Sequence, residues 1–189
     1  MENEVLRTIA QRYSCRAFTD EAPAPEQLDA LAQAAVQSPS GMNKQDWRVI
    51  IVRNRKLMAA LEEDALSALK AAADQSTYDR IMSRGGLLFY NAPVLLMVAY
   101  KPSPTFNTGI DVGILCENIA LAAHSLGLAT CIHGLAGIPF GGPHAAEYKQ
   151  RFGFPEGYEF GIAVLAGYAK PEFPKAPHEP DSTKVSYID

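Results

Sequence analysis

The chain has 189 residues, which is enough to bury a core without disulfides or a structural metal, and we expect one domain over residues 1–189. Its hydrophobic fraction of 48% is ordinary for a globular protein. The formal charge of −4, with no long basic stripe, argues against nucleic-acid binding. No apolar run reaches the roughly 18 residues that a membrane span requires, so no membrane association is expected.

The cysteines and histidines also exclude classes of protein. Cys15, Cys116 and Cys131 form an odd set with no close pair, which predicts reduced thiols and a cytoplasmic location. The four histidines are scattered without a zinc-ligand spacing, so no metal site is expected.

Secondary structure is predicted clearly in the first half of the chain. A helix is expected from Pro25, a residue favoured at the first helical position, to the residues before Pro39. The apolar stretch 47–52 predicts a buried strand. Asn54 is expected to cap a helix whose apolar side chains have helical spacing, namely Leu57, Met58, Leu61, Ala65 and Leu69.

The second half alternates strands and helices. Residues 93–100 and 160–167 predict strands, and a shorter one is expected over 129–132. The strongest helix covers 110–126 and is capped by Gly127. Its inward face is expected to consist of Ile110, Ile114, Leu115, Ala122 and Leu126.

The remaining segments connect these elements or follow them. A glycine-rich turn is expected after the strand over 129–132, followed by a short helix over 143–151. The tail over 171–180 contains four prolines and is expected to be extended.

Residues 12–16 read Arg-Tyr-Ser-Cys-Arg and form the first functional motif. Arginine binds phosphate through a planar fork of donors, and a serine hydroxyl adds another donor. Such a run alone is also typical of a solvated surface segment. The physics of this motif leaves both interpretations open.

Residues 39–47 read Pro-Ser-Gly-Met-Asn-Lys-Gln-Asp-Trp and form the second motif. Side-chain amides donate and accept hydrogen bonds together, which suits the edge of a polar heterocycle. The alternative is a loop whose amides satisfy buried backbone, with Trp47 in the core. One cluster for a phosphate and one for a ring favour a phosphorylated heterocyclic cofactor.

The order and spacing of these two motifs resemble the flavin-dependent nitroreductase family, with Asp46 where the family usually has proline. The resemblance extends through residues 91–93, 111–127 and 157–167, and it is loose over 54–90. It implies an α+β fold with a central mixed sheet between helices. It also implies a homodimer in which the C-terminal tail is exchanged between subunits.

The resemblance assigns most of the candidate cofactor-binding residues. The segment that holds the FMN phosphate, the ribityl chain and the N1/O2 side of the ring would be Arg12, Tyr13, Ser14 and Arg16. The residues that line the pocket from the partner subunit would be Pro39, Ser40, Asn43 and Gln45. The loop beside flavin N5 would be Ile132, His133, Gly134 and Leu135, and Lys175 would stand in for a basic phosphate ligand of the tail.

The implied function is an FMN-dependent enzyme that transfers hydride from NAD(P)H through flavin N5 to a small oxidised acceptor such as a nitroaromatic or a quinone. No catalytic side chain is required, because the flavin carries the chemistry. His133 is either a wall of the pocket or a general acid. Alternatives are reductive dehalogenation, oxidation of a dedicated metabolite, a non-catalytic flavin-binding protein and a cofactor-free scaffold.

Overall fold

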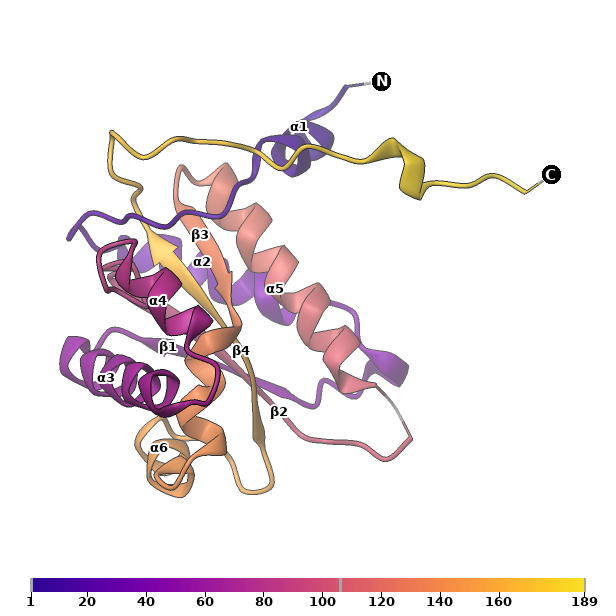
Figure 1. Ribbon diagram of the computed structural model, residues 1–189. Helices are drawn as coiled ribbons and strands as arrows, with labels where there is room; N and C mark the ends of the chain where they lie inside the picture. The colour runs from indigo at the N-terminus through magenta and orange to yellow at the C-terminus, as the bar shows by residue number, and fades with distance from the viewer. Residues whose placement is uncertain (1, 106, 189) are drawn as a thin grey trace.

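A central antiparallel sheet organises the molecule (Figure 1). The computed structural model describes residues 2–105 and 107–188, so Met1 and Asp189, the ends of the expected domain, lie outside it. The strands are β1 (Trp47–Val52), β2 (Val94–Tyr100), β3 (Ala129–His133) and β4 (Glu159–Gly167). Their order in the sheet is β1-β2-β4-β3.

The expected mixed sheet needs a correction. All three strand pairings are antiparallel. Within the described residues, the only parallel pairing is an isolated bridge between Ser14 and Thr130. The α+β class is confirmed, but parallel character is confined to this bridge, because the N-terminal segment meets the edge of the sheet at a single residue.

Six α-helices and three short 3-10 helices occur in the described residues. The α-helices are α1 (Glu4–Gln11), α2 (Pro25–Val36), α3 (Arg55–Ala71), α4 (Ser76–Met82), α5 (Thr108–Ser125) and α6 (Ala145–Arg151). The 3-10 helices are η1 (Gly41–Asn43), η2 (Gly134–Gly141) and η3 (Ser182–Lys184). The helix starts follow the sequence: Pro25 opens α2, and Asn54 accepts a hydrogen bond from the Leu57 N–H at 3.1 Å.

Helices cover both faces of the sheet. On one face, α3, α4, η2 and α6 pack against alternate residues of the central strands, such as Leu95 and Leu165. On the other face, α2 and α5 pack against the intervening residues, such as Leu96 and Val164. Strand β2 is buried along almost its whole length for this reason, and its sequence is accordingly a continuous apolar run.

The inward face of α5 was predicted incorrectly. Leu115 is buried as expected, but Ile110, Ile114 and Leu126 are 61%, 37% and 39% exposed. The buried set is Thr108, Val112, Leu115, Cys116, Ile119, Ala120 and Ala123. Apolar residues occur all round this helix, so their spacing alone does not identify the face that meets the sheet. The exposed isoleucines leave an apolar surface on α5.

Three smaller expectations also differ from the structure. Strand β1 lies at the edge of the sheet, and only Trp47 and Val52 are buried in it. The glycine-rich segment after β3 is the 3-10 helix η2, not an open turn. Helix α4 falls in the stretch where the motifs were weakest, and no helix was predicted there.

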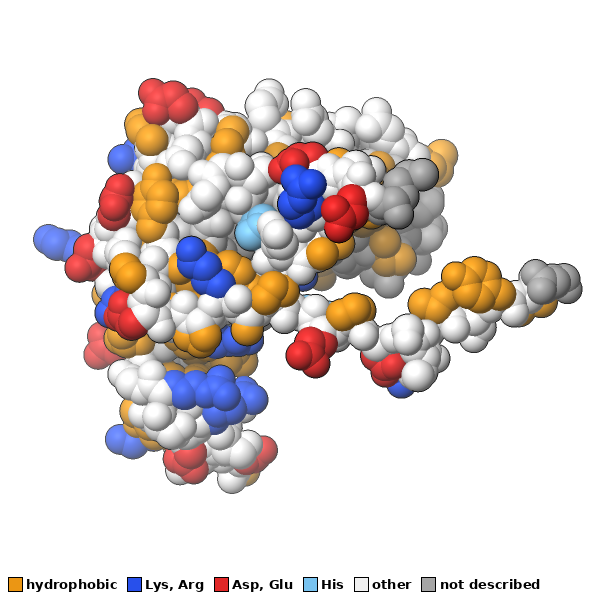
Figure 2. Space-filling model, turned by 90° about the horizontal axis from the view of Figure 1, so that it is seen from above, with side chains coloured by type: hydrophobic (Ala, Val, Ile, Leu, Met, Phe, Trp, Pro, Cys, Tyr) orange, Lys and Arg blue, Asp and Glu red, His pale blue; other side chains and the backbone are white. Residues whose placement is uncertain are grey.

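The C-terminal tail leaves the globular body. Residues 171–180 contain no helix or strand, as expected from their prolines. Figure 1 shows the tail crossing beside α1 and then running clear of the other elements. Figure 2 shows hydrophobic side chains near its far end, where Val185, Tyr187 and Ile188 are 61%, 90% and 97% exposed.

Among the described residues, no helix is long and apolar enough to cross a bilayer.

Candidate functional site

The first motif lines a polar pocket. Arg12, Tyr13, Ser14 and Arg16 face the tail residues 176–179 across a cavity of about 360 Å³. The Ser14 hydroxyl and the Arg16 guanidinium have no hydrogen-bond partner among the described residues. Unpartnered donors in an open polar pocket suit an anionic ligand.

The sheet holds this motif in place. The Cys15 N–H donates to the Thr130 carbonyl of β3 at 2.8 Å, next to the bridge between Ser14 and Thr130. The segment is extended, so alternate side chains point in opposite directions: Tyr13 and Cys15 are buried, whereas Ser14 and Arg16 face outward. Burial against the sheet therefore directs the polar side chains into the pocket.

Arg12 is positioned by a carboxylate. Its Nε donates to Glu117 Oε1 of α5 at 2.9 Å, and its side chain is 25% exposed. The bond uses the Nε–H of the guanidinium and leaves the two terminal nitrogens available for a ligand. The pair orients Arg12, and Glu117 offsets part of its charge when the pocket is empty.

A second pocket adjoins the first. Arg16 lines both, and the second has a volume of about 180 Å³. Its walls come from the end of β3, the start of η2 and the segment around α4, and they consist of Arg16, Arg80, Ile81, Arg84, Tyr90, Cys131, Ile132, His133 and Leu135. The expected N5 loop and the phosphate motif are thus brought to neighbouring cavities that share Arg16.

Gly134 offers a backbone donor at this point. It is the first residue of η2, so its N–H has no partner within that helix. A Cβ added at Gly134 would meet nothing within 4 Å, so the space beside the backbone is open. The geometry allows a flat ring to approach the main chain here.

His133 is buried in the wall of the second pocket. Its side chain is 6% exposed, and its Nε2 has no hydrogen-bond partner. Burial, and to a smaller extent the charge of Arg16, lowers the pKa of His133 to about 4. The imidazole is therefore neutral near pH 7, which favours its role as a pocket wall over that of a charged general acid.

The second motif lines neither of these pockets within one chain. None of Pro39, Ser40, Asn43 and Gln45 lines either cavity. The Gly41 N–H donates to Asp111 in the first turn of α5, whereas Arg12 binds Glu117 six residues further along. The six residues from Asp111 to Glu117 correspond to about 9 Å along α5.

The second motif is nevertheless held in a specific shape. Met42, Asn43 and Gln45 all have positive φ, between 51° and 54°. Gln45 donates to Asn43 Oδ1 through its side chain at 2.9 Å and to Ser40 Oγ through its backbone at 3.0 Å. Non-glycine residues adopt this conformation at a cost, and they cluster at functional sites.

Sequence reasoning missed several residues of the two pockets. The tail reaches the first pocket through residues 176–179, while Lys175 itself is not among the lining residues. Arg80 and Arg84 line the second pocket from α4 and the turn that follows it. No motif in the sequence indicated them, because their position depends on α4 and the end of β3 bordering the same cavity.

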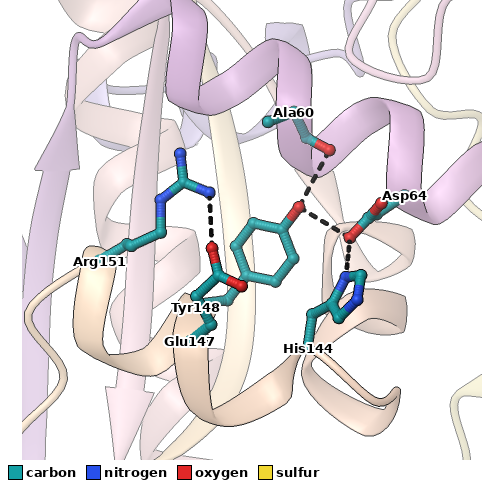
Figure 3. A network of polar contacts seen from close by, with 6 residues as sticks. All are labelled: Ala60, Asp64, His144, Glu147, Tyr148 and Arg151. Carbon is teal, nitrogen blue, oxygen red and sulfur yellow. Dashed lines mark hydrogen bonds and ion pairs between the residues drawn. The ribbon is translucent and has the colours of Figure 1, made fainter.

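A polar network supports the far end of η2 (Figure 3). Asp64 of α3 accepts hydrogen bonds from the Tyr148 hydroxyl and the His144 imidazole, both at 2.9 Å. The Tyr148 hydroxyl also donates to the Ala60 carbonyl at 3.1 Å. The bonds fasten α6 to α3, so η2, which connects the N5 loop to α6, is held at both ends.

The cysteines and the possible metal ligands were also located. All three cysteines are free and buried, and burial raises the pKa of the Cys116 thiol to about 12. Within residues 2–105 and 107–188, no group of three or more His, Cys, Asp or Glu side chains could hold a metal ion.

The structure is an α+β fold with a polar pocket that adjoins a second cavity at Arg16. The sequence profile of the nitroreductase family matches residues 9–168. The chain belongs to the nitroreductase family and is an oxidoreductase of that family. The resemblance expected from residues 12–16 and 39–47 is confirmed.

Solved structures agree with this assignment. A nitroreductase with bound FMN from Desulfitobacterium hafniense DCB-2 is 50% identical, with a TM-score of 0.96 over 100% of both chains. A nitroreductase with bound FMN from Bacteroides fragilis NCTC 9343 is 28% identical, with a TM-score of 0.90 over 100% of both chains. The whole described fold is therefore shared with nitroreductases.

Curated relatives differ in name. A putative NADH dehydrogenase/NAD(P)H nitroreductase of Methanothermobacter thermautotrophicus is 30% identical over 135 residues, 70% of this chain and 61% of that protein. An iodotyrosine deiodinase of Thermotoga neapolitana is 28% identical over 179 residues, 87% of this chain and 90% of that protein. The family therefore contains relatives of this chain that differ in their named reaction.

Proposed function

We propose that this protein transfers electrons from NAD(P)H to a small oxidised acceptor such as a nitroaromatic or a quinone. The observation that carries the proposal is the pair of pockets that share Arg16: Arg12, Tyr13 and Ser14 line the first, and the loop residues Ile132, His133 and Leu135 line the second. The cofactor is FMN, which nitroreductases of the same fold contain.

The residues present fit FMN. The unpartnered Ser14 hydroxyl and Arg16 guanidinium, together with the terminal nitrogens of Arg12, would hold a phosphate in the first pocket. The Gly134 N–H, which has no partner within η2, would donate to the N5 edge of the ring. Arg16, between the two pockets, would face the side of the ring where negative charge collects on reduction.

FMN supplies the redox step, by accepting a hydride equivalent and passing two electrons on. The chain binds and orients it. With a quinone, NAD(P)H and one proton give NAD(P)⁺ and the hydroquinone. With a nitroaromatic, the same donor and proton give NAD(P)⁺, the nitroso compound and water. Donor and acceptor would use one site in turn, which predicts ping-pong kinetics.

We also propose that the working form is a homodimer with shared sites. The exposed Ile110 and Ile114 of α5 supply an apolar surface of the kind that subunit interfaces bury. The tail beyond Pro171 has apolar residues but no core of its own, which supports exchange onto a partner. Ser40, Asn43 and Gln45 would then reach the partner's flavin. The free cysteines support a reducing, cytoplasmic setting.

A second candidate keeps the cofactor and changes the acceptor. The iodotyrosine deiodinase of Thermotoga neapolitana aligns with 87% of this chain, which favours reductive dehalogenation as the alternative. Steady-state turnover with a quinone, with a nitroaromatic and with an iodinated phenol separates the two candidates. A holoprotein that consumes NAD(P)H with none of the three acceptors would contradict both.

The absorption spectrum of the purified protein is the direct test of the proposal. We expect a yellow protein whose visible bands bleach anaerobically when NADH or NADPH is added and return with an acceptor. Acid release of the cofactor should yield FMN, because the first pocket offers one phosphate site. FAD as the main released species, or a colourless protein that does not take up FMN, would contradict the proposal.

A further inference from the structure

The second pocket contains more positive charge than a flavin ring requires. Arg80 lies in the last turn of α4, and Arg84 follows after the Ser83 cap. The Arg84 N–H donates to the Ile81 carbonyl at 3.0 Å, so the chain keeps turning past the end of the helix. Both arginines line the cavity that Arg16 also lines.

The three guanidinium groups have no counterion. Among the described residues, the side chains of Arg16, Arg80 and Arg84 make no hydrogen bond or ion pair. No Asp or Glu lines the cavity. By contrast, Arg12 and Arg151 each pair with a carboxylate. Like charges at one cavity repel each other, and a bound anion would remove that repulsion.

His133 adds a further unsatisfied group to the same wall. His133 lines the cavity with the arginines, and its Nε2 is buried without a partner. A neutral imidazole nitrogen either donates or accepts one hydrogen bond. Buried polar atoms are normally satisfied, so this one leaves an unmet polar contact beside the cavity.

We propose that Arg80 and Arg84 recognise a carboxylate on the acceptor substrate, and that the natural acceptor is a small carboxylate-bearing molecule with an apolar body. The inference rests on the proposed function and deepens it. Arginine forks match a carboxylate with two parallel hydrogen bonds. Ile81, Ile132 and Leu135 line the same cavity of about 180 Å³ and would contact the apolar body.

The phosphates of the nicotinamide donor fit this cavity less well. The 2′-phosphate of NADPH is separated from the nicotinamide by two riboses and a pyrophosphate. The cavity adjoins the N5 loop at His133 and Leu135, where the nicotinamide itself would react. A phosphate at the far end of the donor would lie away from it, whereas a carboxylate on a small acceptor would lie within reach.

The test compares two acceptors that differ in charge and hardly in shape, 4-nitrobenzoate and 4-nitrobenzamide. In an Arg80→Gln, Arg84→Gln double variant, we expect kcat/KM for 4-nitrobenzoate to fall by about ten- to a hundred-fold, the usual loss of a charge-assisted contact. The value for 4-nitrobenzamide should change less than about threefold, because neutral hydrogen bonds contribute less. FMN content should stay at the wild-type value, because neither arginine lines the first pocket.

The exposed Arg48 of β1, which does not line the cavity, provides the matched control. Arg48→Gln removes one positive charge outside the cavity and should leave the two acceptors unchanged relative to each other. A shift of the reduction potential with equal losses for both acceptors would assign the arginines to the flavin. A loss confined to NADPH relative to NADH would assign them to the donor. Either result, or no change at all, overturns the proposal.

Direct binding keeps this inference separate from the proposed function. Benzoate and benzamide are titrated calorimetrically into the FMN-loaded wild type and the double variant, with no turnover required. We expect benzoate to bind more tightly than benzamide in the wild type, and the preference to disappear in the variant. Equal binding of the two compounds to the wild type would overturn the inference even if the protein reduces nitroaromatics.

Discussion

The two motifs that predict cofactor binding are built in opposite ways. Residues 12–16 are anchored on their own sheet, through the bond from the Cys15 N–H to Thr130 and the burial of Tyr13. Residues 39–45 lie beside the start of α5. They are stabilised by bonds among themselves and to Asp111. The first motif lines a pocket within one chain, and the second does not.

In the proposed homodimer, one half of each site would be fixed by its own sheet and the other half would come from the partner. The sheet-anchored half needs no partner to take up its geometry. The other half holds three residues at positive φ, a conformation that persists only where the surroundings fix it. We therefore expect substitutions in the first half to weaken FMN binding, and those in the second to act across the subunit boundary.

The largest expected effect is that of Arg16→Ala, which removes the cation shared by both pockets. FMN affinity should fall by about ten- to a hundred-fold, the typical loss of a charge-assisted contact. The reduction potential should also fall, because reduced flavin loses a neighbouring positive charge. Fluorescence titration of FMN and a redox titration measure the two quantities.

Arg7→Ala is the matched control for that change. Arg7 lies on α1, 52% exposed, and pairs only with Glu4 at 3.0 Å. Exposed pairs contribute little, so FMN affinity should stay within about twofold of wild type. Equal losses in the two variants would mean that Arg16 acts through general charge and not through the pocket.

A mixed dimer tests whether the two halves meet across subunits. An Arg16→Ala chain paired with an Asn43→Ala chain would contain one doubly altered site and one intact site. Activity should therefore recover to about half of wild type, although each variant alone is poorly active. Differently tagged chains, purified in tandem, give the mixed species. No recovery in a confirmed mixed dimer would place both residues at a site within one chain.

Removal of the tail should have an intermediate effect. Truncation after Pro174 deletes residues 176–179 from the first pocket and the exposed apolar end from the proposed interface. We expect FMN affinity to fall about three- to ten-fold, the value of one or two modest hydrogen bonds, and the dimer to dissociate at higher concentration. Sedimentation velocity and FMN titration report both, with a deletion of 182–189 as the comparison.

The smallest expected effect concerns His144→Gln, far from the first half of the site. The hydrogen bond from His144 lowers the pKa of Asp64, and that bond raises the pKa of His144. A raised histidine pKa adds stability below its unfolded value of 6.5, and the contribution disappears as pH rises through the folded pKa. The lowered pKa of Asp64 keeps the pair charged down to below 3.8.

The wild type should therefore exceed His144→Gln in stability most at about pH 5.5, and the difference should shrink by about pH 8. Urea denaturation at the two pH values measures it. FMN affinity should be unaffected, because residues 12–16 are anchored on β3 and not on α6. A loss of FMN affinity in this variant would show that η2 transmits the change to the N5 loop.

The sequence by itself determined the features that depend on local chemistry. Pro25 and Asn54 fixed the starts of α2 and α3, and the apolar run over 93–100 identified the strand β2. The spacing of Arg12, Ser14 and Arg16 was enough to place them together, because an extended segment projects alternate side chains to one side. Local rules suffice wherever the neighbours in space are also neighbours in the chain.

Only the tertiary structure decided which surfaces meet. The buried face of α5 depends on how the helix lies on the sheet, since apolar residues surround it. Arg80 and Arg84 reach the second pocket because α4 and the end of β3 border the same cavity, and no spacing in the sequence records that arrangement. The same holds for Asp64 and His144, which bond across 80 residues. Long-range packing brings such groups together, and its energy comes from burial of apolar surface, which carries little information about individual partners.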